Sequence, residues 1–251
     1  IAGRLFEPCE ASGAPLLVWA GPERLAADLA RRSGWALAAV DYRFGSEQLF
    51  PAALSDVYRC LAHFAAAGGR PAIAVGGCGF GGGLAAAAAL LARRYGDPAP
   101  AAQVLLAPLL DMRLASPSWE RHAGPAERQQ LDAEIARHAP GLDRTDPLLS
   151  PLYAGDFSGL PDAVIVTAGA DPRRDDGERY AQLLSEAGVV VWGHRYPELT
   201  HADACAGAAT AAGEVVVNGL ASALRLALSK ATQSPPRSSS QRADASRSAR
   251  A

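Results

Sequence analysis

The chain has 251 residues, of which 49% are apolar and 20% charged; 24 basic side chains nearly balance 26 acidic ones, giving a pI near 6.2. At roughly 100 to 200 residues per domain, this length is sufficient for one large domain with a full hydrophobic core. The balanced charge excludes a strongly basic face for nucleic acid, and no apolar run approaches the roughly 20 residues that cross a bilayer. We therefore predict neither nucleic acid nor membrane as a partner.

Short apolar segments alternate along the chain with longer segments of helical periodicity. Strands are predicted at residues 4–6, 15–19, 35–41, 72–75, 102–106, 163–168 and 189–196. Helices are predicted at residues 22–32, 51–67, 80–94, 126–138, 174–187 and 202–228. Regular alternation of strand and helix predicts an α/β fold: a three-layer α/β/α sandwich around a mostly parallel, doubly wound sheet.

The composition changes abruptly near the C-terminus. From residue 232 the sequence is rich in serine, arginine and proline and has no apolar residue larger than alanine. Such a segment buries too little surface to offset its ordering entropy. We predict one domain over residues 1–229 and a disordered tail over residues 230–251. The chain begins at Ile1, so residue 1 need not be the true N-terminus.

Four cysteines, Cys9, Cys60, Cys78 and Cys205, lie far apart without C-x-x-C spacing. This pattern favours neither a zinc site nor a disulfide framework, and a reducing cytoplasm is the expected location. No His/Asp/Glu group has ligand spacing such as H-E-x-x-H, so neither a metal nor another cofactor is predicted. The residues do not indicate an oligomeric state.

A glycine-rich turn joins the strand ending near Val75 to an alanine-rich helix. Gly77, Gly79 and Gly82 fit the dinucleotide fingerprint G-x-G-x-x-G, but the turn does not follow the first strand, and no acidic residue ends the next one. The alternative is the nucleophile elbow G-x-S-x-G, in which a strained residue projects its side chain above the sheet. Residues 77–81 read G-C-G-F-G, so this frame is present without its central serine.

The surrounding segments resemble the esterases of the hormone-sensitive lipase branch of the α/β-hydrolases. Residues 41–56 are similar to the family pattern D-Y-R-L-A-P-E-x-x-F-P-A-A-x-x-D, and residues 146–152 to D-P-x-x-S-P-L. Residues 159–161 match its G-L-P turn, while residues 168–177 and 196–201 resemble the segments that carry its catalytic aspartate and histidine. These matches occur in the family's order over most of residues 1–205.

The resemblance implies that Asp171 is the catalytic acid and His201 the base. Each follows an apolar strand, at the carboxyl edge where α/β folds place their sites. A carboxylate that accepts from one imidazole nitrogen would orient His201 and leave the other nitrogen free for proton transfer. From the residues alone, Asp171 could instead cap a helix, and His201 could be a solvated loop residue. The other histidines have no comparable setting and are interpreted as surface or packing residues.

Three departures from the family pattern stand beside these matches. Gly79 falls on the family's serine and Cys78 on the acidic residue before it. The family's H-G-G-G run, which supplies most of the oxyanion hole, is replaced by Ala20-Gly-Pro-Glu23 in a shortened loop. The family's N-terminal cap helices and first strand have no counterpart before Ile1.

The resemblance and the departures together predict a degenerate esterase-like or lipase-like homologue that is not an efficient carboxylic-ester hydrolase. One alternative is a pseudoenzyme that binds a partner or a small acyl-ester-like or apolar molecule. Others are a lyase, isomerase or cyclase that uses Asp171 and His201 as a general acid/base pair, and a weak hydrolase acting through an activated water. Cys78 and Phe80 are predicted to line the pocket. Cys78 is interpreted as a buried packing residue, since it lies one position before the tip of the elbow.

Overall fold

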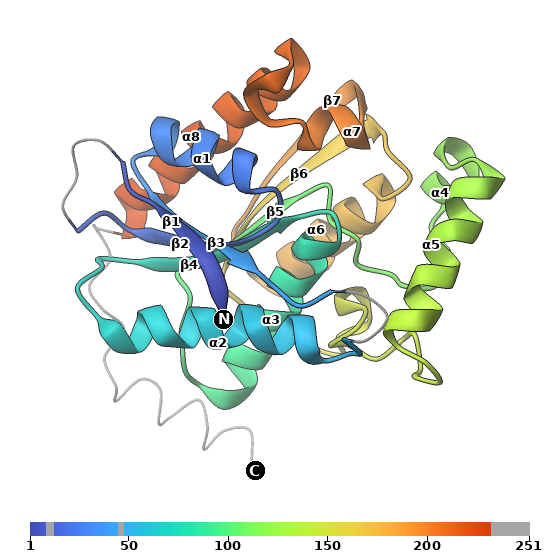
Figure 1. Ribbon diagram of the computed structural model, residues 1–251, viewed down its shortest axis with the longest axis horizontal. Helices are drawn as coiled ribbons and strands as arrows, with labels where there is room; N and C mark the ends of the chain where they lie inside the picture. Colours follow the sequence, from blue (N-terminus) through green and yellow to red (C-terminus); the bar gives the residue numbers. More distant parts are fainter. Residues whose placement is uncertain (9–12, 45–47, 232–251) are drawn as a thin grey trace.

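The computed structural model, which describes residues 1–8, 13–44 and 48–231, is built around one twisted sheet (Figure 1). In this described part, seven strands lie in the order β1-β3-β2-β4-β5-β6-β7, and all neighbours are parallel except β1 and β3. The strands are β1 Ala2–Phe6, β2 Leu16–Ala20, β3 Ala36–Asp41, β4 Ile73–Cys78, β5 Ala102–Leu106, β6 Asp162–Ala170 and β7 Val191–Thr200.

Helices cover both faces of the sheet (Figure 1). One face packs against α1 Glu23–Ser33 and α8 Ala211–Ala231 through a core that includes Leu29 and Leu220. The other packs against α2 Ala52–Ala67, α3 Phe80–Tyr95 and α6 Arg174–Glu186 through residues such as Leu54 and Tyr180. The remaining helices are α4 Pro117–His122, α5 Pro125–His138 and α7 His201–Cys205, with short 3₁₀ turns at Pro151–Tyr153 and Gly207–Ala209.

The central strands are apolar throughout because both of their faces are covered. All five residues of β2 and all five of β5 are buried. Helix α3 packs close to the sheet because its inward positions are glycine and alanine, and eleven of its sixteen residues are buried. Small residues here let the backbones of β4 and α3 approach each other at the turn between them.

The predicted fold class is confirmed: the chain forms a three-layer α/β/α sandwich with a mostly parallel sheet. Helix α4 was not predicted, and the helix expected over residues 202–228 is divided into α7, a 3₁₀ turn and α8. Helix α8 continues to Ala231, two residues past the predicted domain boundary at residue 229. The rest of the predicted tail, residues 232–251, lies outside the described residues.

No helix within the described part of the chain is both long and apolar enough to span a membrane.

Candidate functional site

Gly79 forms the sharp turn between β4 and α3. Its backbone lies at φ 58° and ψ −121°, a region in which a residue with a side chain is strained. The Gly79 N–H donates to the carbonyl of Leu106 (3.0 Å), and its own carbonyl accepts from Leu109 (2.9 Å) and Gly82 (3.1 Å). These bonds fix the turn at the carboxyl ends of β4 and β5.

Asp171 and His201 come together above the same edge of the sheet. Asp171 follows β6 directly, and His201 begins α7 immediately after β7. His201 Nδ1 lies 2.8 Å from Asp171 Oδ2, a hydrogen bond that places the proton on Nδ1 and leaves Nε2 available as a base. The two residues that the sequence proposed as a dyad are therefore hydrogen-bonded partners.

Asp171 is fully buried, and its two carboxylate oxygens have different partners. Oδ2 accepts from His201, while Oδ1 accepts from the Arg173 backbone N–H at 2.9 Å and lies 3.4 Å from the Arg173 guanidinium. Asp171 therefore makes both contacts considered from the sequence: a helix-capping hydrogen bond to the Arg173 backbone and a hydrogen bond to His201. Burial by itself raises the pKa of Asp171, but the hydrogen bond and charge of His201, together with Arg173, outweigh it and hold that pKa below the ordinary value. Asp171 is consequently an anion that can orient the imidazole and stabilise an imidazolium.

The imidazole of His201 faces the turn at Gly79. A Cβ atom built on Gly79 would lie 3.3 Å from both Cε1 and Nε2 of His201. A hydroxyl on that carbon would therefore be within reach of Nε2, as in a nucleophile–base pair. The three predicted positions Gly79, Asp171 and His201 are brought together, with no side chain at the first of them.

The loop after β2 is as short as the sequence predicted. β2 ends at Ala20, and α1 begins at Glu23, with Pro22 capping the helix. The Ala20 carbonyl oxygen packs against the elbow, 2.5 Å from where a Cβ of Gly77 would lie, so the β2 end fills the space beside the elbow. Glu23 forms an ion pair with Arg4 on β1, which balances its charge.

Cys78 and Cys205 form a disulfide, with their Cα atoms 6.7 Å apart. Cys78 is buried in the core, as the sequence predicted, but it is also bonded, so the expectation that the cysteines favour no disulfide is wrong for this pair. The bond joins the residue before Gly79 to the last residue of α7, across 127 positions of sequence. It ties the elbow to the short helix that carries His201. Cys205 lies four residues after His201, a helical spacing that brings two side chains to one face and that could have signalled the contact.

Phe80 lies in an aromatic cluster next to the elbow. Its ring lies near those of Tyr42, Phe44 and His138, at centroid distances of 6.4, 5.0 and 5.3 Å. His138 is buried, its Nδ1 has no hydrogen-bond partner among the described residues, and burial lowers its pKa, so it is a neutral packing group. His138 packs among these rings, as predicted, whereas the role of Phe80 in lining a substrate pocket stays a prediction.

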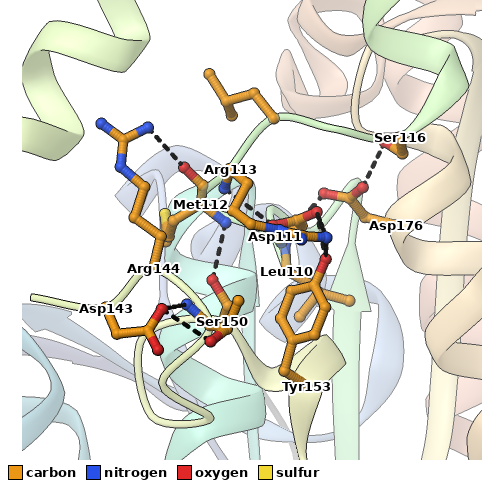
Figure 2. A network of polar contacts seen from close by, with 12 residues as sticks. Leu110, Asp111, Met112, Arg113, Ser116, Asp143, Arg144, Ser150, Tyr153 and Asp176 are labelled. Atoms are coloured by element: carbon orange, nitrogen blue, oxygen red, sulfur yellow. Dashed lines mark hydrogen bonds and ion pairs between the residues drawn. The ribbon is translucent and has the colours of Figure 1, made fainter.

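A buried polar network fixes the loop between β5 and α4 (Figure 2). Asp176 accepts from the Ser116 hydroxyl at 2.6 Å and from the backbone N–H groups of Leu110 (3.4 Å) and Asp111 (3.3 Å). Asp111 in turn accepts from the Tyr153 hydroxyl at 2.7 Å. The Leu109 N–H of the same loop donates to the Gly79 carbonyl, so the network fixes the loop that holds the elbow in place. Neither aspartate was singled out from the sequence, although Asp176 lies within the segment 168–177 that resembles the family's aspartate segment.

Burial, together with the nearby Asp111 charge, raises the pKa of Asp176 to about 7 in spite of its hydrogen bonds. A carboxyl group with a raised folded-state pKa contributes stability that is complete below its unfolded pKa and is lost as the pH rises through the folded value. We therefore expect the parent chain to lose roughly 2–4 kcal/mol of unfolding free energy between pH 4 and pH 8, relative to Asp176→Asn. Urea unfolding of both proteins at each pH measures this difference. Parallel pH profiles for the two proteins would contradict it.

Within the described residues, no group of three or more His, Cys, Asp or Glu side chains could hold a metal ion.

Comparisons with known proteins agree with this architecture. Residues 17–204 match the family described as alpha/beta hydrolase fold. The chain is 40% identical to Carboxylesterase NlhH of Mycobacterium tuberculosis over 173 residues, which are 64% of this chain and 54% of the relative. It is 38% identical to Carboxylic ester hydrolase LipN of Mycobacterium tuberculosis, over 76% of this chain and 54% of the relative. The chain thus spans about half the length of these two curated relatives.

Solved structures show the same fold over most of the chain. A bacterial heroin esterase superimposes with a TM-score of 0.80 at 31% identity, covering 90% of this chain and 79% of that one. An α/β hydrolase from the metagenome of Lake Arreo, Spain, superimposes with a TM-score of 0.84 at 30% identity, with coverage of 90% and 78%. The chain therefore belongs to the α/β-hydrolase fold family, in the branch that resembles hormone-sensitive lipase and includes carboxylesterases.

Proposed function

We propose that this chain is a degenerate member of its carboxylesterase family, in which Gly79 stands in place of the serine nucleophile and the Asp171–His201 dyad acts as a general acid/base pair. One observation carries the proposal: His201 Nε2 lies 3.3 Å from the position of a Cβ on Gly79. The base is aligned with the elbow, but the elbow supplies no hydroxyl. Serine-based acyl transfer is then unavailable, and the chain is not an efficient carboxylic-ester hydrolase.

The β2–α1 turn supports the same conclusion independently. The residues between Ala20 and Glu23 leave no room for a glycine-rich loop of N–H donors, and Pro22 has no N–H at all. Loss of one oxyanion donor alone costs roughly 10²- to 10³-fold in rate. Two separate parts of the serine machinery are therefore missing, and the dyad is retained.

The retained dyad can still move a proton. His201 Nε2 can accept a proton from a water or from a substrate carbon or hydroxyl, and Asp171 stabilises the imidazolium that results. General acid/base catalysis contributes roughly 10²- to 10⁴-fold, which allows slow hydrolysis of an activated ester by a His201-bound water. The ligand would be a small acyl-ester-like or apolar molecule held against Phe80 and its aromatic neighbours.

A second candidate function uses the same groups without hydrolysis. The space at Gly79 and the intact hydrogen bond between His201 and Asp171 favour a lyase, isomerase or cyclase step, in which the dyad removes and returns a proton. A pseudoenzyme that binds its ligand without turnover would not need this hydrogen bond.

We propose the cytoplasm as the location, where the Cys78–Cys205 pair would be exposed to reducing thiols.

Turnover of p-nitrophenyl acetate by the parent chain and by His201→Ala tests the proposal. We expect a kcat/KM for the parent far below the roughly 10⁴–10⁸ M⁻¹s⁻¹ of efficient enzymes, and a further loss of about 10²-fold in His201→Ala. Circular dichroism establishes that both proteins are folded. Efficient hydrolysis by the parent would overturn the claim about Gly79, and equal rates in both proteins would overturn the role of the dyad.

A further inference from the structure

A sulfur atom lies next to the catalytic face of the imidazole. Cys205 Sγ is 3.7 Å from His201 Nε2, and Nδ1 of the same ring is 2.8 Å from Asp171. Sulfur, imidazole and carboxylate thus form a continuous chain of three groups. This order of groups is the one by which a thiol gives its proton to a histidine that an aspartate orients.

The redox state of one bond decides whether that sulfur can react. Cys205 is bonded to Cys78 in the structure, so its sulfur carries no proton and is no nucleophile in this form. Cys78 is buried, with 8% of its surface exposed, whereas Cys205 is only partly buried. Of the two bonded residues, Cys205 is therefore the more exposed. After reduction, its thiol lies beside His201.

The remaining cysteine described by the structure has a different setting. Cys60 is an unbonded thiol on α2, and burial raises its pKa to about 11. Its thiolate is scarce near neutral pH, and no histidine contact activates it among the described residues. Cys60 is thus a built-in control for the reactivity of Cys205.

We propose that Cys205 is a nucleophile of this protein: in the reduced chain, Cys205, His201 and Asp171 form a Cys–His–Asp triad that accepts acyl groups from activated carboxylic esters, and the disulfide with Cys78 switches it off. The proposal shares the Asp171–His201 dyad with the proposed function and adds the group that the elbow lacks. It assigns catalysis to a residue of α7 rather than to the strand-to-helix turn.

Each step of the cycle balances. Two molecules of a small thiol reduce the Cys78–Cys205 bond, giving two protein thiols and one small-molecule disulfide. The Cys205 proton passes to His201 Nε2 as the sulfur bonds to the ester carbonyl carbon, and the carbon–oxygen bond to the alcohol breaks. His201 returns the proton to the departing alcohol. Water, deprotonated by His201, then attacks the thioester carbon, and the carbon–sulfur bond breaks to give the carboxylic acid and the Cys205 thiol.

The surroundings suit an acyl group at this position. Helix α3 begins at Phe80, and the positive end of its dipole lies at the elbow; the Gly82 and Gly83 N–H groups of its first turn donate to the Gly79 carbonyl. Cys78 immediately precedes this turn, so the disulfide holds Cys205 at the same place. The aromatic rings around Phe80 provide an apolar wall for the acyl chain.

Reductant-dependent turnover tests the proposal with four variants of the full chain. The proteins are treated with tris(carboxyethyl)phosphine, which reduces the disulfide while it is oxidised to its phosphine oxide by oxygen from water, and are then desalted under argon. With p-nitrophenyl acetate, we expect reduction to raise the kcat/KM of the parent and of Cys60→Ala by roughly 10²-fold. Cys205→Ala should show no increase, and Cys78→Ala should show it before any reduction, because it cannot form the bond. His201→Ala should also lose the increase.

Mass spectrometry of the acylated protein identifies the nucleophile directly. After rapid acid quenching, the reduced parent should carry one acetyl group on the peptide that contains Cys205, removable by neutral hydroxylamine as a thioester is. Alkylation of Cys205 by iodoacetamide at pH 7 should also be roughly tenfold slower in His201→Ala. Circular dichroism of each variant separates loss of the thiol from loss of the fold.

The outcomes separate this proposal from the proposed function. An increase that persists in Cys205→Ala but disappears in His201→Ala would overturn the role of Cys205 and leave the dyad acting on water. An acetyl group found on another residue, or no effect of reduction, would likewise overturn it. Loss of neither basal nor reductant-dependent turnover in His201→Ala would overturn both proposals.

Discussion

Gly79→Ser is expected to raise kcat/KM for p-nitrophenyl acetate by roughly 10³-fold over the parent. A complete serine triad is worth about 10⁶-fold, and the shortened β2–α1 turn should cost roughly 10²- to 10³-fold of that gain. The gain depends on alignment that already exists, since the new Cβ would lie 3.3 Å from His201 Nε2. The close approach requires a small shift of the imidazole. The positive φ at position 79 adds backbone strain of about 1–3 kcal/mol for a residue with a side chain.

Matched variants isolate the hydroxyl in this experiment. Gly79→Ala imposes the same backbone strain and the same contact with His201 but carries no oxygen, so it should remain at the parent's rate. All variants are built in a Cys205→Ala background, so that no thiol beside His201 contributes. Adding His201→Ala to Gly79→Ser should remove the gain. A folded Gly79→Ser variant without any gain would show that the dyad is not aligned with the elbow.

Gly81→Ala is expected to lower the free energy of unfolding by about 3 kcal/mol or more, at the upper end of overpacking effects. A Cβ at this position would fall far inside van der Waals contact with the Ala20 carbonyl oxygen. Both groups belong to backbone, one in α3 and one at the end of β2, so neither can turn away as a flexible side chain would. The variant measures how tightly the shortened turn after β2 packs on the elbow.

Gly193→Ala is the control for this substitution. A Cβ on Gly193 meets nothing within 4 Å, and its φ is not in the left-handed region, so its stability should change by less than about 0.5 kcal/mol. Urea unfolding followed by circular dichroism gives both values. A Gly81→Ala variant as stable as Gly193→Ala would contradict the close packing of β2 against α3.

The elements with strong periodicity were predictable, and those created by tertiary contacts were not. The strand at residues 102–106 was predicted with the bounds of β5, because a buried parallel strand is a continuous apolar run. Helix α4 has six residues and begins with Pro117, so it is too short to show a period. The strand ending in the elbow was predicted to stop at Val75, but β4 continues to Cys78, because glycines at positions 76 and 77 lower local strand propensity without preventing pairing.

The candidate site was predictable where motifs mark it. Each of its three positions, Gly79, Asp171 and His201, directly follows a strand and lies in a segment that resembles the family. Parallel strands bring their carboxyl ends to one edge of the sheet. The Cys78–Cys205 bond and the burial of Asp176 carry no such signal, because both depend on neighbours distant in sequence. The disulfide joins residues 127 positions apart, and Asp176 is buried against a loop more than 60 residues away. No local pattern encodes such contacts.

Covalent labelling with a fluorophosphonate, read by intact mass and peptide mapping, tests the absence of a serine nucleophile most directly. Such reagents phosphonylate an activated serine and need no substrate specificity. We predict that the parent chain gains no serine adduct, whereas Gly79→Ser gains one, located at position 79 and absent when His201→Ala is added. A stoichiometric serine adduct on the parent chain would show that it has an activated serine after all.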